Sequence, residues 1–299
     1  MKKLLLILLF ILFISAILNA QIIRGGGQST SLNRSNSGNN KFFAVGYWKN
    51  KSAEIGAIAV SDANGENWNV HTAPVLEYEL YPDNPGIEVT IDPRVYGIAY
   101  ANGTYIAVGS NGWSAWSTDG AAWNPVWIEP FSQDGQRDNN QDALTIATDG
   151  IRFFTGGTRG KLAWSQTGRS WTWIANGLLD GEYNDILCIT YGNNKFIAAG
   201  TSGKIKSAEW DQATLRFGDG FVSEQIPLIN SDINAVVWGG GHFLAVGNRG
   251  MMALSTDGSD WKTVDDAVSR WSESENIYSA VFGGDHFITG GHAKIVFND

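Results

Sequence analysis

The chain has 299 residues, a formal net charge of −9 and a single cysteine. The acidic balance repels phosphate backbones, so nucleic acid is not expected as a partner, and one cysteine excludes an intrachain disulfide, so the fold depends on its hydrophobic core. The sequence contains no phosphate loop, nucleotide fingerprint or catalytic serine motif, and its four histidines lack metal-ligand spacing. We therefore expect neither a metal nor another cofactor.

The N-terminal end, residues 1–20, has the form of a secretory signal peptide. Two lysines precede an apolar run over residues 4–18, and the small residue Ala20 follows. Cleavage would make Gln21 the first residue and predicts a secreted or periplasmic protein. An uncleaved membrane anchor is the alternative, because the apolar run approaches the length of a spanning helix, and it would then be the chain's contact with a membrane.

Residues 21–40 form a separate N-terminal segment before the main pattern begins. Much of it is rich in Ser and Asn and has no apolar periodicity, as in a solvated lead-in. Its one apolar stretch, residues 21–24, is a candidate for a strand that closes the domain. Residues 32–37 have the right position for a first strand, although the middle of this stretch is polar. Both interpretations stay open.

Residues 41–299 repeat one pattern of short apolar runs separated by turn residues. In the clearest copy, residues 233–261, three apolar runs are separated by glycine-rich turns and followed by an Asp-Gly turn and a Trp. Further copies with increasing drift are residues 96–123, 144–171 and 187–210. Each copy predicts one sheet of four antiparallel strands, which is too small to be stable alone.

One glycine closes the second strand of each copy and marks the repeat. These glycines are Gly46, Gly109, Gly157, Gly200, Gly247 and Gly291. A four-stranded unit that recurs at roughly 40–50 residues is typical of a propeller, so the sequence predicts an all-β, six-bladed β-propeller of four-stranded antiparallel blades. Because the chain ends on a third strand, residues 294–297, we expect an N-terminal strand, residues 21–24, to complete the last blade.

The turns between third and fourth strands share a Ser-Thr-Asp-Gly-x-x-Trp pattern, in which the drifted third copy replaces Asp by Thr167. The pattern resembles the Asp-box, or BNR, repeat of sialidase-like and photosystem II assembly factor-like propellers. In such a turn the Asp accepts hydrogen bonds from backbone N–H groups, the Gly takes a positive φ and the Trp packs on the blade. The resemblance therefore implies a structural role, without ligand contact, for Ser117, Asp119, Trp123, Ser165, Trp171, Ser255, Asp257 and Trp261.

The same family includes secreted glycosidases, which gives a catalytic alternative. Resemblance to the sialidases implies an arginine triad, a Phe-Arg-Ile-Pro motif and a Tyr–Glu pair, but the motif is absent and only Arg159 and Arg249 occupy equivalent turns. Other glycosidases need two carboxylates at a defined separation, and none can be paired from the sequence. We therefore expect an exported scaffold, more readily non-catalytic than enzymatic, that binds a protein or a glycan, with a glycoside hydrolase as the alternative.

The predicted binding face is the one that carries the turns between second and third strands. Arg159 and Arg249 lie in such turns, and Trp113 and Trp48 fall at or next to the equivalent turns of the second and first blades. Long acidic loops share this face, and Arg and Trp dominate binding hot spots. We predict a binding site at these four residues. The alternatives are that the acids only solvate the loops and that Trp113 packs between blades.

Overall fold

The computed structural model describes residues 43–49, 54–62, 66–79, 88–91, 93–129, 141–174, 184–211, 216–217, 222–224, 231–264, 270–283, 285–292 and 294–298. The predicted signal peptide and the predicted closing strand, residues 21–24, lie outside these ranges. Within them, regular structure consists of β-strands and short 3-10 turns, without an α-helix. These residues accordingly contain no helix with the length and apolarity needed to span a membrane.

Six antiparallel sheets of three or four strands follow one another along this part of the chain. The first contains β1 (Phe43–Lys49), β2 (Glu54–Ser61) and β3 (Trp68–Thr72), and the second contains β6 (Val95–Ala101), β7 (Thr104–Gly109), β8 (Trp113–Ser117) and β9 (Asn124–Trp127). The third contains β10 (Ala143–Thr148), β11 (Phe153–Gly157), β12 (Leu162–Ser165) and β13 (Thr172–Trp173). The fourth contains β14 (Ile186–Gly192), β15 (Lys195–Gly200), β16 (Ile205–Ala208) and β19 (Val222–Glu224). The fifth contains β20 (Ile233–Gly239), β21 (His242–Gly247), β22 (Met252–Ser255) and β23 (Lys262–Thr263), and the sixth contains β24 (Ile277–Gly283), β25 (His286–Gly291) and β26 (Lys294–Asn298).

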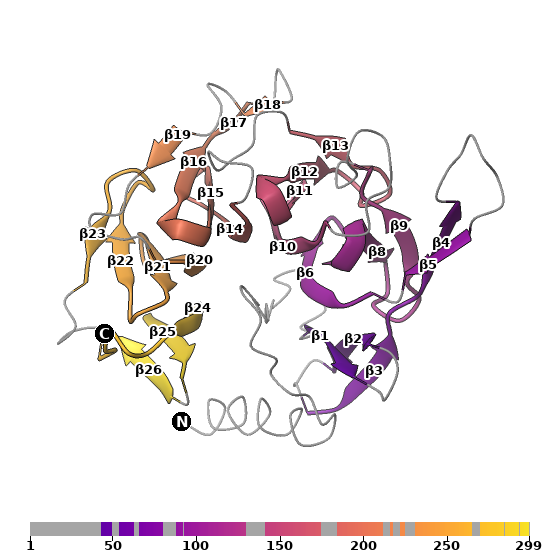
Figure 1. Ribbon diagram of the computed structural model, residues 1–299, viewed down its shortest axis with the longest axis horizontal. Coiled ribbons are helices and arrows are strands. Elements are labelled where there is room, and N and C mark those ends of the chain that lie inside the picture. Colours follow the sequence, from indigo (N-terminus) through magenta and orange to yellow (C-terminus); the bar gives the residue numbers. More distant parts are fainter. Residues whose placement is uncertain are drawn as a thin grey trace.

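The sheets are arranged in chain order around a common centre, with their first strands innermost (Figure 1). Each inner strand packs on the inner strand of the next sheet, β6 on β10, β10 on β14, β14 on β20 and β20 on β24. The first sheet, in indigo, and the sixth, in yellow, are the two ends of the series. This stacking buries both faces of a sheet that could not fold alone.

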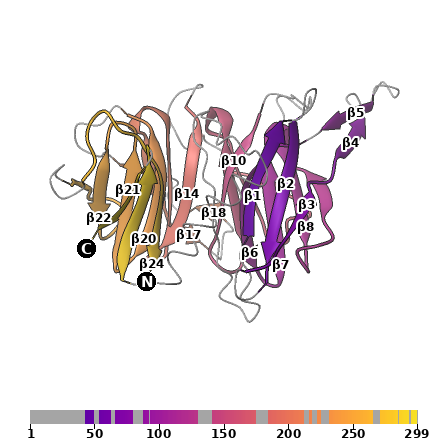
Figure 2. The ribbon, with the colours of Figure 1, turned by 90° about the horizontal axis from the view of Figure 1, so that it is seen from below.

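Two hairpins interrupt the regular pattern. The hairpin of β4 (Leu76–Glu79) and β5 (Glu88–Ile91) lies between the first two sheets in sequence and stands away from the ring (Figures 1 and 2). The hairpin of β17 (Trp210–Asp211) and β18 (Arg216–Phe217) is inserted before β19, so the fourth strand of that sheet comes later than the sequence predicts. The first hairpin lies in one of the long acidic loops that the sequence predicts. The sequence does not reveal its strands, because their glutamates obscure the alternation of apolar residues.

The first sheet differs from the predicted four-stranded pattern. Gly46, expected to close a second strand, lies inside β1 opposite Ala57. In the second and third sheets, the second strand packs against the first strand of the next sheet: β7 packs against β10, and β11 packs against β14. β1 packs against β6 in the same way, so β1 has the place of a second strand. The described first sheet therefore contains the second, third and fourth strands of the pattern, and the described sixth sheet contains the first three.

Four of the six marker glycines make a close backbone contact that leaves no room for a Cβ atom. A Cβ atom on Gly109, Gly200 or Gly247 would overlap the backbone carbonyl oxygen of the residue that precedes the first strand of the same sheet. Gly291 is in the same position, whereas a Cβ on Gly46 would meet nothing within 4 Å. The repeat period found in the sequence is therefore the period of this contact between first and second strands.

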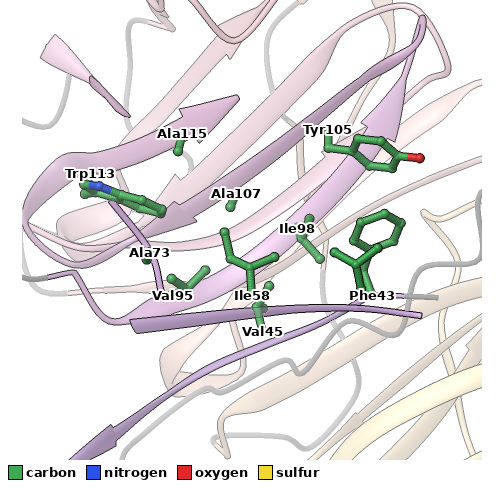
Figure 3. Close-up of a cluster of buried hydrophobic side chains, with 11 residues drawn as sticks. Phe43, Val45, Ile58, Ala73, Val95, Ile98, Tyr105, Ala107, Trp113 and Ala115 are labelled. Carbon is green, nitrogen blue, oxygen red and sulfur yellow. The ribbon is translucent and has the colours of Figure 1, made fainter. Parts of the chain in front are cut away.

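The core consists of clusters between neighbouring sheets. Between the first and second sheets, Phe43 and Ile58 pack against side chains of β6, β7 and β8, among them Tyr105 and Trp113 (Figure 3). The rings of Phe43 and Tyr105 have centroids 4.4 Å apart. Such inter-sheet burial is the main source of stability for the fold.

Candidate functional site

Four turns between second and third strands share one backbone conformation. They are η1 (Ser110–Gly112), η3 (Thr158–Gly160), η4 (Thr201–Gly203) and residues 248–250, and we call them the tip turns. The middle residue of each has a left-handed φ, 56° for Arg159 and 60° for Arg249, and the following glycine also has a positive φ. This conformation costs energy for a residue with a Cβ atom, so each tip turn needs partners that hold it.

The partners come from the next sheet. The residue immediately before the next first strand accepts a hydrogen bond from the backbone N–H of the left-handed residue, and we call these acceptors the linking residues. The four bonds are Asn111 N–H to Asp142 Oδ1 (2.9 Å), Arg159 N–H to Asp185 Oδ1 (2.9 Å), Ser202 N–H to Asp232 Oδ1 (2.9 Å) and Arg249 N–H to Asn276 Oδ1 (3.0 Å).

Three of the linking residues, Asp142, Asp185 and Asp232, are also bonded to a tip turn of their own sheet. The N–H of Asp185 donates to Thr201 Oγ1 over 2.9 Å, and the carbonyl of Asp185 accepts the N–H of Thr201 over 3.1 Å. Asp142 makes the same pair of bonds with Thr158. The interpretation that the loop acids only solvate the loops is therefore wrong for Asp142, Asp185 and Asp232, because their carboxylates connect neighbouring sheets.

Arg159 and Arg249 both lie on the face that carries the tip turns, as the topology predicts. Their side chains are exposed, and their backbones are fixed by the linking residues Asp185 and Asn276. The Arg249 guanidinium lies 3.8 Å from the Glu273 carboxylate, and both side chains are mostly solvent-accessible. An exposed ion pair of this kind contributes little free energy, so Arg249 can exchange it for a ligand at low cost.

An ion pair stabilises the segment next to the tip turn of Arg249. Lys294 Nζ lies 2.7 Å from Glu275 Oε2 and 4.5 Å from the centroid of the Trp271 ring. The hydrogen bond from Lys294 lowers the pKa of Glu275 to about 2. The backbone carbonyl of Glu275 accepts the N–H of Gly250, so this pair fixes the segment against which the tip turn rests.

Of the other two predicted site residues, Trp113 lies away from this surface. Trp113 is 0 % exposed, and its Nε1–H donates to the Pro74 carbonyl over 2.9 Å. The expectation that Trp113 supplies aromatic surface is wrong, because it is the first residue of β8 and its side chain packs between the first and second sheets. Trp48 lies in β1 opposite Ile55, and the structure describes its backbone only.

Sequence reasoning missed an apolar group at the inner end of the tip-turn face. Tyr96, Leu144 and Leu187 are the second residues of three successive first strands, each at a register shift, and they form a buried cluster with Tyr47 packed against it. The Tyr96 hydroxyl donates to Asp142 Oδ2 over 3.2 Å, and burial raises the pKa of Tyr96 well above its ordinary value. The tip-turn face thus combines outer cations, an intermediate row of linking residues and an apolar interior.

The Ser-Thr-Asp-Gly turns lie at the opposite ends of the strands and use their polar groups internally. Asp119 Oδ1 accepts the N–H groups of Ala121 (2.8 Å) and Ala122 (2.9 Å), and the Ser117 hydroxyl also donates to it. These bonds, first of all that from Ala121, lower the pKa of Asp119 to about 2. Gly120 has a φ of 78°, which only glycine adopts without strain.

These turns also pack tightly against the preceding sheet. A Cβ on Gly258 would lie 2.6 Å from Ile197 Cδ1, and a Cβ on Gly168 would overlap Ile106. Trp261 Nε1–H donates to the Gly258 carbonyl over 3.0 Å, whereas Trp171 Nε1–H donates to Ser114 Oγ of the second sheet over 3.3 Å. The contacts of these turns are therefore with the turn itself and with the neighbouring sheet.

Asp257→Ala is expected to lower the free energy of unfolding by about 1–2 kcal/mol at neutral pH. Hydrogen bonds from the N–H groups of Asp260 and Ser259 hold the pKa of Asp257 below its ordinary value of 3.8. Because the folded pKa is depressed, the stabilisation is complete above that value and is lost as the pH falls below it. Urea unfolding of wild type and variant between about pH 5 and about pH 2 should show the difference narrowing. Asp260→Ala, in the same turn, is the control, and a difference independent of pH would contradict the assignment.

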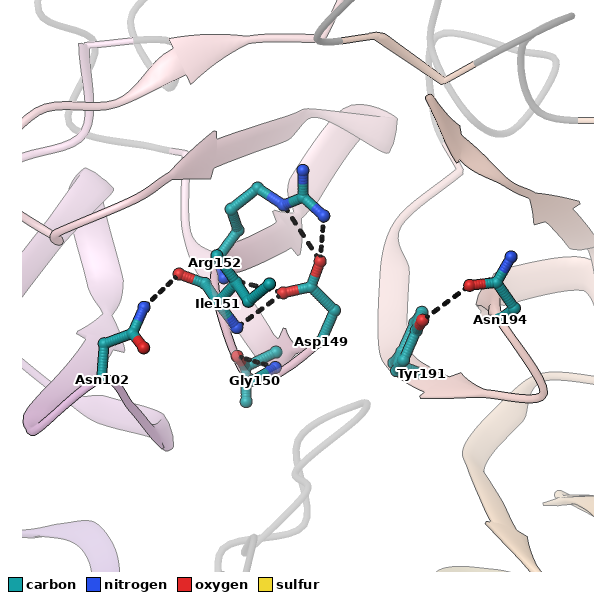
Figure 4. Close-up of polar contacts among 8 residues, drawn as sticks. Asn102, Asp149, Gly150, Ile151, Arg152, Tyr191 and Asn194 are labelled. Carbon is teal, nitrogen blue, oxygen red and sulfur yellow. Dashed lines mark hydrogen bonds and ion pairs between the residues drawn. The ribbon is translucent and has the colours of Figure 1, made fainter. Parts of the chain in front are cut away.

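A buried ion pair closes the hairpin between β10 and β11 on this opposite side (Figure 4). The Asp149 carboxylate pairs with the Arg152 guanidinium and also accepts the N–H groups of Ile151 and Arg152 over 2.9 and 2.7 Å. Asn102 of the preceding hairpin donates to the Ile151 carbonyl over 2.9 Å. Arg152 is thus part of the scaffold, unlike the arginines of the tip turns.

In the part of the chain that the structure describes, no group of three or more His, Cys, Asp or Glu is placed to hold a metal ion.

Comparison with known proteins identifies the fold. No protein-family model and no curated protein matches the sequence. Among solved structures, YCF48 from Cyanidioschyzon merolae is similar with a TM-score of 0.56 and 17 % identity, over 87 % of this chain and 79 % of that one. A structure of YCF48 bound to D1 peptide is similar with a TM-score of 0.52 and 17 % identity, over 86 % of this chain and 73 % of that one. Together with the antiparallel sheets around a centre, these similarities show a β-propeller fold.

Proposed function

We propose that this chain is an exported, non-catalytic β-propeller that binds a partner protein on the face of its tip turns. One observation carries the proposal: Arg159 and Arg249 are exposed on that face, and each is mounted on a turn that the adjacent sheet holds rigidly. A backbone that is already fixed loses little conformational entropy on binding, and arginine is enriched in hot spots. The similarity to YCF48 bound to D1 peptide supports a protein rather than a glycan as the partner.

The proposal includes the finer features that the sequence predicts. The propeller has six blades, an N-terminal strand at residues 21–24 pairs with the free edge of β26, and the Ser-Thr-Asp-Gly turns are Asp-box repeats. Export follows from the signal-peptide pattern of residues 1–20. A glycoside hydrolase remains the alternative, and it is supported by the resemblance of the turns alone.

Replacing both Arg159 and Arg249 by Ala is expected to weaken partner capture by roughly tenfold or more, because a hot-spot arginine contributes more than about 1 kcal/mol. The measurement is quantitative mass spectrometry of proteins retained from cell-envelope extract, with a glycan array in parallel. The matched control is Arg169→Ala with Lys262→Ala, which removes the same charge from exposed sites outside the tip turns. An unchanged set of partners with an intact fold by circular dichroism would move the site elsewhere. Retention of glycans alone would favour the glycan alternative.

A further inference from the structure

Among the described residues, none covers the apolar face of the sixth sheet on the side away from the fifth. Val281 of β24 is 47 % exposed and Ile295 of β26 is 38 % exposed. Ile288 of β25 is partly exposed, although Ile106 and Ile197 at the same position of their sheets are fully buried. We call Val281, Ile288 and Ile295 the closing face, because the corresponding face of the other sheets is covered by the next sheet.

The fourth and fifth sheets are covered by the next sheet in the same way. An aromatic side chain of the next first strand lies on the glycine that ends a first strand, Trp238 on Gly192 and Phe282 on Gly239. The equivalent glycine of the sixth sheet, Gly283, is exposed, and a Cβ on it would meet nothing within 4 Å. The sixth sheet therefore has the surface features that receive a first strand, while the described residues place none on it.

The sequence before β1 encodes a hairpin already present in the fourth sheet. Residues 38–42, Gly-Asn-Asn-Lys-Phe, repeat residues 192–196, which form the turn between β14 and β15 with φ values of 45° at Asn193 and 60° at Asn194. Positive φ at both central residues is the type I′ turn that joins two paired strands. Since β1 has the place of a second strand, the same turn at residues 38–41 predicts a first strand just before it.

We propose that residues 32–37 form the innermost strand of the first sheet and cover the closing face of the sixth. This goes beyond the proposed function, which concerns the tip turns and a different segment, residues 21–24. Alignment with β20 places Leu32, Ser35 and Ser37 at the positions that face the preceding sheet. The segment is tethered directly to β1, so its effective concentration at this position exceeds that of any second molecule. Because its residues are mostly polar, the contact between this segment and the closing face would bury less apolar surface than the other contacts between sheets. It would therefore be the first of these contacts to open.

A disulfide tests the contact. Ser37 aligns with Trp238 and Phe282, so in Ser37→Cys/Gly283→Cys the two thiols would face each other as Trp238 faces Gly192. Cys188 is buried and burial raises its pKa to about 12, so it does not compete. Mild oxidation of the full chain should give an intramolecular disulfide, identified by peptide mapping and by mobility on a non-reducing gel. The single variants and Ser37→Cys/Thr256→Cys, whose second site is exposed on the fifth sheet, should not.

Two results would overturn the proposal. One is the absence of the bond in a folded double variant, and the other is a disulfide-linked dimer, which would make a second copy the occupant. If the double variant does not fold, amide hydrogen exchange of a chain with residues 32–37 replaced by Gly and Ser gives the answer. Exchange in β24 should then rise by tenfold or more while exchange in β14 stays unchanged, and equal protection of β24 in both chains would reject the contact. Partner capture through the tip turns is a separate readout and can fail independently.

Discussion

Trp113→Ala is expected to lower the free energy of unfolding by about 3–5 kcal/mol, the range for truncation of a large buried aromatic side chain. The indole is 0 % exposed and belongs to the cluster between the first and second sheets. Its loss leaves a cavity next to Val95 and Ala73. These two residues belong to separate segments, which could fill the cavity only if their backbones moved. It also leaves the Pro74 carbonyl without its donor.

Chemical unfolding at equilibrium measures this effect. The control is Trp173→Ala, because Trp173 is 43 % exposed in the outer strand of the third sheet, and its truncation should cost no more than about 1 kcal/mol. A Trp113→Ala variant with the stability of wild type would contradict the burial. A stable Trp113→Phe variant that loses its partner would restore the predicted binding role.

Gly200→Ala is expected to cost at least about 3 kcal/mol or to prevent folding, at the upper end of the range for steric overpacking. The added Cβ would overlap the backbone carbonyl of Asp185 and lie 3.1 Å from the backbone nitrogen of Leu187. The Asp185 carbonyl is held in place, because it accepts the N–H of Thr201 and the Asp185 carboxylate accepts the N–H of Arg159. The φ of Gly200 is −176°, which any residue adopts, so the penalty is purely steric.

Gly46→Ala is the matched control, since both glycines were identified by the same sequence pattern. A Cβ on Gly46 has no neighbour within 4 Å, so we expect a change of no more than about 1 kcal/mol in either direction. Thermal and urea unfolding of both variants would test the pair. Equal effects of the two substitutions would show that the contact with the carbonyl does not determine the choice of glycine.

These glycines explain how much of the fold could be predicted from the sequence. Gly109, Gly200 and Gly247 recur because a backbone contact excludes every other residue, and a constraint of this kind leaves a periodic signal. The first sheet was harder, since Gly46 matches the pattern without the contact. The hairpin of β4 and β5 was missed because alternating Glu residues in a two-stranded ribbon resemble an acidic loop.

The site was predictable only in part. Topology places Arg159 and Arg249 on one face whatever the details of the turns. Trp113 follows a tip-turn glycine by one residue, where the strand has already begun, and the alternation of the strand directs its side chain inward. The linking residues were missed because the tip turn and its acceptor are 26 to 31 residues apart, a separation that varies from sheet to sheet. Loops of variable length conceal such a pair from any short sequence window.

The linking residues also have a consequence for the history of the chain. Each carboxylate or amide connects one sheet to its immediate neighbour and to no other. Through these bonds the described sheets behave as a row of units, each coupled only to the adjacent unit, as in solenoid arrays. A gene duplication that copies one sheet together with its linking residue supplies both halves of the new junction at once, so the number of units can change in evolution without redesign of the others.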